Sequence, residues 1–304
     1  MKQEKKLRSL ATLYRIDHGR KFRLGDFDPE DTGGLSGEFK DESKQLLEHS
    51  TQQLAELQDK LYAQDRWGLL LIFQAMDAAG KDGTIKHVMS GVNPQGCEVF
   101  SFKAPSEEEL AHGYLWRTSK CVPGRGKIGI FNRSYYEEVL VVRIHPELLQ
   151  AQRLPAECVS DKIWKERFED ISAFERYATR NGIAIRKFFL NLSKEEQKRR
   201  FLSRLDEPEK NWKFSAADVR ERRFWDDYQK NFEEMIRHTS SKDAPWIVVP
   251  ADNKWFARLV VSSVIIHALE EMKLSYPAVS DEKQRSLSAA RRELEGKSEP
   301  KKKT

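Results

Sequence analysis

The strongest constraint on the fold lies in residues 69–88, where an apolar run leads into a turn of small residues and then directly into a helix-forming segment. Gly80 and Gly83 let backbone N–H groups converge on an anion without obstruction by a Cβ atom. The N-terminus of the following helix carries partial positive charge, and Lys81 adds a full one. The segment therefore predicts a phosphate-binding loop between a buried strand and a helix.

The spacing matches the common G-x-x-x-x-G-K-[ST] loop in part, because Ala75 stands at the first glycine and Asp82 at the hydroxyl position. One alternative is a plain tight turn with Lys81 in solvent. Asp77 favours the phosphate loop together with a metal ion. A carboxylate beside phosphates would repel them unless a cation lies between, so Asp77 predicts Mg²⁺ or another hard cation.

Further strand patterns alternate with helical ones along the chain. We expect strands at residues 97–102, 127–131, 183–190 and 245–250. We expect helices over residues 41–65, 106–119, 164–180, from 193 onward, 217–238 and 255–273. This alternation predicts a doubly wound parallel sheet with helices on both faces, within one α/β domain at residues 41–275. An irregular arm over residues 1–40 and a charged tail over 276–304 are expected to flank it.

Three local features of these helices are also predicted. Ser106 followed by Glu109 reads as a capping box. Val219 and Phe224 are expected in the core with Tyr228, because they share a helical period. Asp252 is expected to be the N-cap of the last helix of the domain.

Composition limits the class of protein. Of the 304 residues, 39% are hydrophobic and 33% are charged, which is typical of a soluble globular protein. No stretch approaches the roughly 20 apolar residues of a membrane span, and the start of the sequence lacks the apolar centre of a signal peptide. A cytoplasmic protein without a membrane partner is therefore expected, and Cys97, Cys121 and Cys158 are expected to be reduced thiols.

A polar and aromatic cluster follows the predicted strand at residues 127–131. Asn132 and Arg133 come first, and Glu137 lies one helical turn later. Ligands of open parallel sheets bind beyond the carboxyl ends of the strands, so this position favours a functional role. Helix capping would explain the glutamate but would not require Asn132 and Arg133.

A basic segment, residues 198–223, is interrupted by Asp206, Glu207 and Pro208. The plain interpretation of such a charge run is a solvated helix face. The break favours a helix-turn-helix flap, and a flap with several arginines is suited to cover a phosphoryl donor and exclude water. Lys and Arg also crowd this region and the C-terminal end, although the net charge is only +5, which favours a polyanionic partner.

Taken together, residues 75–83, residues 127–137, the basic segment and residues 212–215 resemble the family-2 polyphosphate kinases over about residues 20–275. The resemblance implies a three-layer α/β/α P-loop kinase fold, similar to thymidylate kinase, with a parallel sheet and a helical lid at about 195–223. It also implies Mg²⁺-dependent, reversible transfer of a terminal phosphoryl group between inorganic polyphosphate and a nucleotide, without a covalent enzyme intermediate. Mn²⁺ is an alternative metal.

The resemblance assigns roles residue by residue. It implies catalytic roles for Asp77, Lys81, Asn132, Arg133 and Glu137, with Asp77 and Glu137 as metal ligands. It implies phosphate binding by Ala79, Gly80, Lys81, Asp82, Gly83, Thr84, Arg199, Arg200, Arg204 and Lys213. Asn132 with Glu137 looks like the third subclass, whose members phosphorylate both AMP and ADP, yielding ATP, with guanine nucleotides as further acceptors. A homodimer or homotetramer is implied, and no nucleic-acid partner is expected.

Two alternatives stay open at the level of sequence. The first is an ATP-dependent kinase of a nucleotide or another small molecule. The second is a non-enzymatic polyanion-binding protein that uses the basic segment and the tail, and whose binding would depend strongly on salt and not on Lys81.

Overall fold

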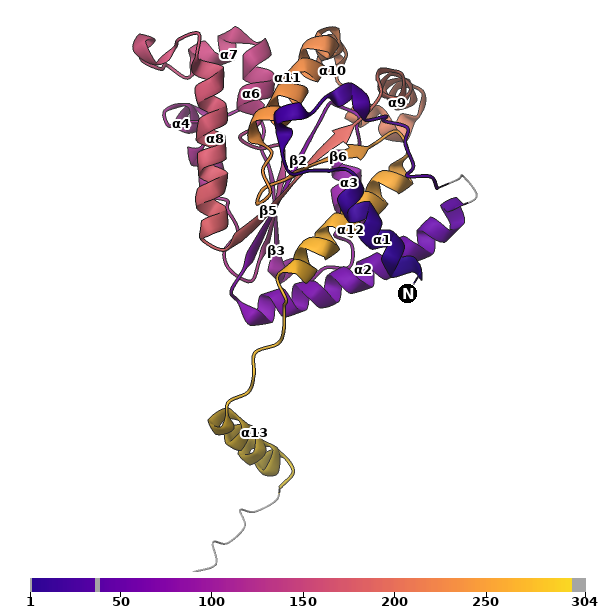
Figure 1. Cartoon of the computed structure of the whole chain (residues 1–304), viewed down its shortest axis with the longest axis vertical. Coiled ribbons are helices and arrows are strands. Elements are labelled where there is room, and N and C mark those ends of the chain that lie inside the picture. Colours follow the sequence, from indigo (N-terminus) through magenta and orange to yellow (C-terminus); the bar gives the residue numbers. More distant parts are fainter. Residues whose placement is uncertain (1, 36–38, 297–304) are drawn as a thin grey trace, which may run out of the picture. The chain divides into compact units, whose positions relative to one another are not determined.

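The structure, a computed structural model, describes residues 2–35 and 39–296. The chain divides into two units that span residues 1–274 and 275–304. The first unit contains a six-stranded sheet in the order β1-β6-β5-β2-β4-β3 (Figure 1). The strands are β1 (Arg15–Ile16), β2 (Gly68–Ala75), β3 (Cys97–Ser101), β4 (Ile128–Asn132), β5 (Ile183–Asn191) and β6 (Trp246–Pro250).

Five of these strands pair in parallel, as the alternation of strand and helix predicts. The two-residue strand β1 adds an antiparallel edge to β6, so the sheet is mixed. β2 lies between β5 and β4 and is buried along almost its whole length. The phosphate loop therefore begins at the carboxyl end of an interior strand.

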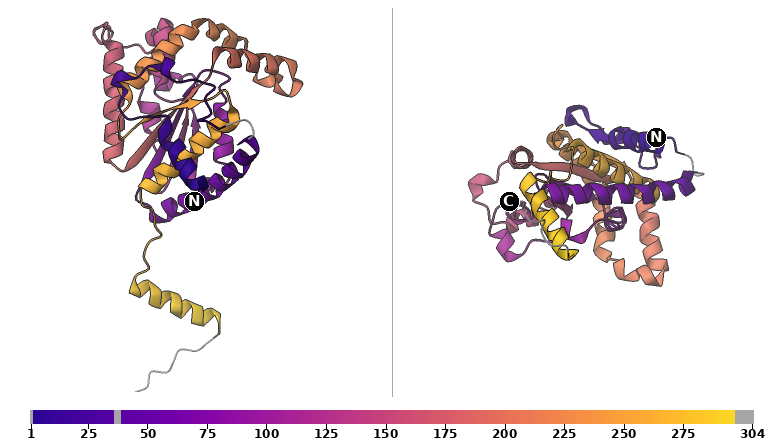
Figure 2. Two further views of the ribbon diagram at one scale, coloured as in Figure 1. Left: turned by 45° about the vertical axis from the view of Figure 1, so that its right-hand side comes forward. Right: turned by 90° about the horizontal axis from the view of Figure 1, so that it is seen from below.

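Helices cover both faces of the sheet, which confirms the three-layer arrangement (Figure 2). Leu69 and Leu71 of β2 join the hydrophobic core on the face of α1, α2, α3 and α12. Leu70 and Ile72 point to the opposite core, which contains residues of α6, α8 and α11. This alternation follows from the two-residue period of side chains along a strand.

The helices of the first unit are α1 (Lys2–Leu13), α2 (Phe39–Gln64), α3 (Lys81–Val88), α4 (Glu107–Leu110), α5 (Trp116–Ser119), α6 (Glu137–Ile144), α7 (Pro146–Ala151), α8 (Ile163–Arg180), α9 (Lys194–Asp206), α10 (Ala216–Glu221), α11 (Trp225–Thr239) and α12 (Lys254–Glu271). Short 3₁₀ segments join several of them, and Pro208–Lys213 connects α9 to α10. None of the described helices is long and apolar enough to cross a membrane.

Two predicted helices are interrupted. The capping box of Ser106 and Glu109 is present, but α4 ends at Leu110 and the helix resumes only at Trp116. Gly113 lies in the break, and glycine is a poor helix former. The predicted helix over 217–238 is likewise split, by a 3₁₀ turn at Arg222–Phe224.

The predicted core assignment of this split helix is confirmed on α11, where Phe232 and Met235 are buried, and is wrong for the residues before it. Tyr228 is buried on α11, but Val219 and Phe224 are 43% and 37% exposed. Both precede α11, in the part of the helical run that extends away from the sheet toward the lid. Val219 precedes the 3₁₀ turn at Arg222–Phe224 and Phe224 ends that turn, so neither continues the buried face of α11.

The N-terminal arm was predicted to be irregular, and this was wrong for its first part. α1 packs against α12, where Leu10 and Ala11 are buried, and Tyr14 packs edge-on against Phe256. The apolar stripe of α1 is short and follows a highly charged start, so it is weak in the sequence, and packing against α12 stabilises it. The second unit contains α13 (Asp281–Leu294), which has no buried residue, in agreement with the expected exposed tail.

Candidate active site

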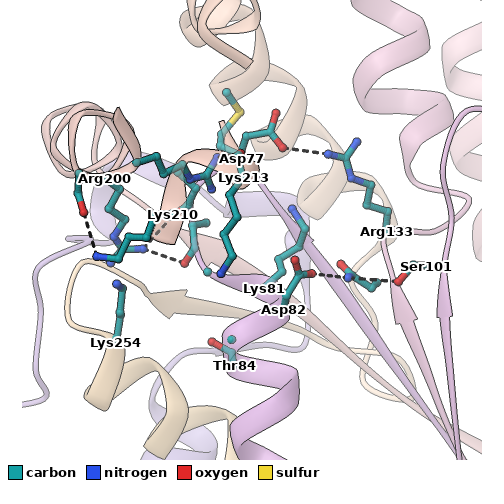
Figure 3. A pocket seen from close by; sticks show the side chains of 18 of the residues that line it. Asp77, Lys81, Asp82, Thr84, Ser101, Arg133, Arg200, Lys210, Lys213 and Lys254 are labelled. Atoms are coloured by element: carbon teal, nitrogen blue, oxygen red, sulfur yellow. Dashed lines mark hydrogen bonds and ion pairs between the residues drawn. The ribbon is translucent and has the colours of Figure 1, made fainter. Parts of the chain in front are cut away.

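A cavity of about 740 Å³ lies at the carboxyl ends of β2, β3 and β4 (Figure 3). Its floor is the phosphate loop and the start of α3, residues 76–84. The other lining residues come from three places. They are Ser101, Phe102, Lys103, Ala104, Asn132 and Arg133 from the β3 and β4 ends, Arg200, Ser203, Arg204, Lys210 and Lys213 from the lid, and Lys254 and Arg258 from α12.

The loop adopts a strained turn that its small residues make possible. Ala78 has a φ of 64° and Gly80 a φ of 94°, so both lie in the left-handed region. For a residue with a Cβ atom this region costs roughly 1–2 kcal/mol. α3 begins directly after Gly80, and the N–H of Thr84 donates to the Gly80 carbonyl at 2.9 Å. The loop therefore places the N-terminus of α3 at the cavity, as a phosphate cradle requires.

Lys81 is buried against its own loop. Its Nζ donates to the carbonyl oxygen of Ala75 at 3.0 Å, and the residue is 9% exposed. Burial lowers the pKa of Lys81, and the nearby positive charge of Arg133 lowers it further, against the raising effect of Asp77. An anion in the cavity would add to the negative charge that Asp77 already places near this ammonium group.

Arg133 joins the loop to the β4 exit. Its Nη2 donates to Oδ1 of Asp77 at 2.9 Å, and its Nη1 lies 3.4 Å from Oε2 of Glu137. Arg133 also has a left-handed backbone, with a φ of 64°, and its N–H donates to the Phe73 carbonyl. Glu137 and Asp77 raise the pKa of this guanidinium, so it is held as a cation between the two carboxylates.

Asn132 precedes Arg133 at the end of β4 and contacts the start of α3. Its Nδ2 donates to Oδ1 of Asp82 at 2.6 Å and lies 3.5 Å from Oγ of Ser101. The four residues that the sequence singles out near the loop, Asp77, Lys81, Asn132 and Arg133, thus all line one cavity. Glu137 does not line it and reaches it through Arg133.

Some of the lid residues that were expected to bind phosphate line the cavity, and one does not. Arg204 and Lys213 line the cavity, and Nη1 of Arg204 contacts both Asp218 and the carbonyl of Lys213, at 3.3 and 3.2 Å. Arg199 does not line the cavity: its side chain is 73% exposed and pairs with Glu196 at 2.6 Å. The next residue, Arg200, does line the cavity. Successive residues of an α-helix point about 100° apart, so Arg199 and Arg200 face different directions.

Arg200 lines the cavity, but protein atoms already occupy its hydrogen-bond donors. Nε donates to Glu196, and the two Nη atoms donate to four backbone carbonyls, those of Ala78, Ala79, Ala251 and Asp252. A guanidinium has five N–H groups, so none is left over for a phosphate in this arrangement.

Asp252 is not the N-cap that the sequence suggests. The N-cap of α12 is Asn253, and Oδ1 of Asp252 instead accepts from the N–H of Ser193 at 2.8 Å. The carboxylate therefore ties the β6 exit to the start of α9. The Asp252 carboxylate thus binds the distant N–H of Ser193 and not an N–H in the first turn of α12. The sequence does not reveal this choice of partner.

Sequence reasoning missed several cationic residues of the cavity. Lys254 and Arg258 lie four residues apart on α12 and line the cavity with Lys103 and Lys210. Burial lowers the pKa of Lys254, and the charge of Arg200 adds to this effect. The available signal was the pair of cations at helical spacing immediately after a buried strand.

The arrangement can bind a highly charged anion and carry out phosphoryl transfer. Phosphoryl transfer needs positioned cations around the phosphates and a means to exclude water, rather than a protein nucleophile. The cavity provides the first through its Lys and Arg side chains, and residues of the segment from α9 to Lys213 line it, where a cover would have to lie. No group of three or more His, Cys, Asp or Glu side chains arranged for a metal occurs among the described residues.

Comparison with known proteins gives consistent matches. The family model described as Polyphosphate kinase 2 (PPK2) matches residues 38–277. An ADP-polyphosphate phosphotransferase of Rhodopseudomonas palustris is 51% identical over 92% of this chain and 97% of its own length. An AMP/ADP-polyphosphate phosphotransferase of Meiothermus ruber is 44% identical over 87% of this chain and 94% of its own.

A solved structure agrees with the sequence matches. The crystal structure of polyphosphate kinase 2 from Arthrobacter aurescens TC1 superposes with a TM-score of 0.83 at 40% identity, covering 92% of this chain and 96% of that one. The family match covers the phosphate loop, the β4 exit and the lid together. The chain belongs to the polyphosphate kinase 2 family.

Proposed function

We propose that this chain transfers the terminal phosphoryl group of inorganic polyphosphate to AMP and ADP, reversibly and with Mg²⁺. The observation that carries the proposal is the number and spread of cations around one cavity. Lysine and arginine side chains from the loop, the β3 and β4 ends, the lid and α12 line it together. A chain of phosphates, with about one negative charge for each unit, matches such an extended lining better than a single nucleotide does.

The relatives support the donor and both acceptors. One is named an ADP-polyphosphate and the other an AMP/ADP-polyphosphate phosphotransferase. A further relative, 35% identical over 66% of this chain, is named a GDP-polyphosphate phosphotransferase, which supports guanine nucleotides as additional acceptors. Within this chain, β4 ends on the uncharged amide of Asn132, and Glu137 supplies a carboxylate just over one helical turn later.

The chemistry is one displacement at phosphorus. An oxygen of the acceptor's terminal phosphate forms a bond to the terminal phosphorus of the chain, the bridging P–O bond breaks, and polyphosphate shortened by one unit leaves. Lys81 and Arg133 both line the cavity, which supports the proposal that they balance the charge of the transferred group. In this proposal the lid serves to exclude water. The reverse direction uses the same positions.

Asp77 is the residue that would hold Mg²⁺, with Glu137 as the second carboxylate. The donor set fits this metal, because Mg²⁺ is commonly bound by one or two carboxylates together with substrate phosphates and water. When bound, the ion supplies positive charge that lowers the repulsion between donor and acceptor phosphates. In this structure the guanidinium of Arg133 pairs with both of these carboxylates.

The test compares donors in one assay. The protein is mixed with Mg²⁺, AMP or ADP, and either polyphosphate or ATP, and the nucleotides are resolved over time. We expect ADP and ATP to form from polyphosphate, and Lys81→Ala to abolish this. Phosphorylation from ATP alone would show an ATP-dependent kinase. Polyphosphate binding that is salt-dependent, indifferent to Lys81→Ala and without nucleotide product would show a polyanion-binding protein.

We further propose that the protein acts in the cytoplasm, where nucleotides are held, as a homodimer or homotetramer. The assembly rests on the family resemblance, and light scattering of the purified chain tests it. A monomer at micromolar concentration would contradict it.

A further inference from the structure

Three successive carbonyl oxygens of the phosphate loop accept hydrogen bonds from one face of α9. Nε2 of Gln197 donates to the carbonyl of Asp77 at 3.0 Å. Nη1 of Arg200 donates to the carbonyls of Ala78 and Ala79, at 3.1 and 2.9 Å. Gln197 and Arg200 are three residues apart on the helix and only 1% and 7% exposed. The first turns of α9 therefore hold the loop along its whole bend.

The same guanidinium also holds a second segment. Nη2 of Arg200 donates to the carbonyls of Ala251 and Asp252, at 2.7 and 2.9 Å. These residues end β6 and lead into α12, which presents Lys254 and Arg258 to the cavity. β5 lies between β2 and β6 in the sheet, so the two segments are not neighbours in the hydrogen-bonded ladder. Arg200 is a direct link between them.

The link determines how the loop faces an anion. In a trans peptide the C=O and the N–H point in opposite directions. The Ala79 carbonyl points to Arg200, so the N–H of Gly80, in the same peptide unit, points away from it. Carbonyls turned into the cradle would repel phosphate, whereas N–H groups bind it.

We propose that Arg200 is a positioning residue that fixes the phosphate loop relative to the start of α12 and keeps the loop carbonyls out of the anion site. Gln197 supports the same loop through one hydrogen bond. This role differs from the phosphate contact that the sequence suggests, and it rests on the proposed function only for its kinetic test.

Arginine is suited to the role because of its shape. Its planar fork reaches two carbonyls on each side while Nε pairs with Glu196 at 2.6 Å. A lysine at this position keeps the charge but concentrates its donors at one atom, so it cannot span both segments. Charge and geometry can therefore be separated by substitution.

The test uses Arg200→Lys and Arg200→Met. We expect both variants to lose roughly 100-fold in kcat, since a shift of about 1 Å in a catalytic group can cost that much, with a smaller change in KM for polyphosphate. Gln197→Met should also lower kcat, but by a smaller factor than the Arg200 variants do. Activity close to wild type in Arg200→Lys, with a large loss in Arg200→Met, would overturn the proposal in favour of a charge contact.

The matched control is Arg186→Lys. Arg186 is also 7% exposed and also donates to a backbone carbonyl and a glutamate, at 2.8 and 2.5 Å. Its partner Glu271 ends α12, about 25 Å along the helix from Lys254. We expect Arg186→Lys to destabilise the protein without the loss in kcat. An equal loss in both variants, at equal unfolding temperature, would overturn a positioning role.

A second measurement does not depend on catalysis. Amide hydrogen exchange should become faster in peptides covering the phosphate loop and the β6–α12 junction in Arg200→Lys, and stay unchanged there in Arg186→Lys. Calorimetry with inorganic triphosphate should show weaker binding in Arg200→Lys. Unchanged exchange would overturn the proposal. A wild type that binds triphosphate but makes no nucleotide would instead count against the proposed function alone.

Discussion

Arg133 and Asp77 form an ion pair of 2.9 Å that connects the exit of β4 to the phosphate loop. Both residues follow the carboxyl ends of strands that are neighbours in the sheet, which is why they meet. The pair keeps the cationic group beside the loop and leaves the Arg133 side chain 41% exposed to the cavity. A metal ion that took Asp77 would free donors of Arg133 for a phosphate.

The first prediction concerns Arg133 itself. We expect Arg133→Lys to lower kcat by roughly 10³-fold, because a lysine cannot contact a carboxylate and a phosphoryl group in a bidentate way. The fold should persist, since the side chain is partly exposed. Steady-state kinetics and thermal unfolding measure the two effects. Arg143→Lys is the control, because Arg143 lies in α6 and pairs with Glu234 at 2.5 Å, and equal losses in both variants would contradict the prediction.

The second prediction concerns acceptor choice. We propose that the carboxylate of Glu137 serves AMP, the acceptor with fewer phosphates, so Glu137→Gln should reduce AMP use at least tenfold more than ADP use. Glu137 acts next to Arg133, at 3.4 Å, so the total activity should also fall. The ratio of kcat/KM for AMP and ADP is the measurement. If the variant lowers both values by the same factor, Glu137 does not determine acceptor choice.

The third prediction concerns pH. Burial holds the pKa of Lys81 below 10.5, with Arg133 as the next cause. Only the protonated amine pairs with phosphate, so kcat/KM for polyphosphate should fall as pH rises, with a midpoint below that value. In Lys81→Arg the guanidinium stays charged, and the alkaline decline should move to higher pH even if activity is lower. An alkaline decline at the same pH in both proteins would assign it to another group.

The fourth prediction concerns a buried ion pair behind the site. Nζ of Lys187 contacts Oε2 of Glu175 at 2.6 Å, and the hydroxyls of Tyr135 and Tyr136 donate to Oε1 at 2.9 and 2.7 Å. Glu175→Gln leaves a buried ammonium without its counter-charge, which should lower the free energy of unfolding by about 3–5 kcal/mol.

Urea unfolding measures this change, with Glu169→Gln as the control. Glu169 pairs with Lys165 at 3.8 Å, and both side chains are more than half exposed. Its replacement should change the free energy of unfolding by less than about 1 kcal/mol. Equal effects of the two replacements would mean that burial does not increase the contribution of the Lys187–Glu175 pair to the free energy of unfolding.

Much of the site was predictable because it is encoded locally. The run from β2 into Gly80, Lys81 and α3 is continuous in the sequence, and backbone preferences alone specify a strand, a turn and a helix. Asn132 and Arg133 were predictable for a related reason. Parallel strands carry their carboxyl ends to one edge, so residues that follow two such strands come together.

The lid shows where this reasoning stops. Arg199 and Arg200 are adjacent in the sequence and chemically identical, yet one is in solvent and the other holds two loops. Asp252 likewise binds Ser193, 59 residues away, instead of capping its own helix. The α1 helix forms against α12 although its own apolar stripe is short.

The sequence by itself determined the strand-loop-helix unit, the parallel order of strand and helix, and the chemistry of the loop. Only the tertiary structure decided which arginine reaches the loop, that Lys254 and Arg258 line the cavity, and that Glu137 contacts Arg133 without lining the cavity itself. The physical reason is range. Backbone preferences act over a few residues, whereas the partners of a long charged side chain are set by which distant segments the packed sheet brings within its reach.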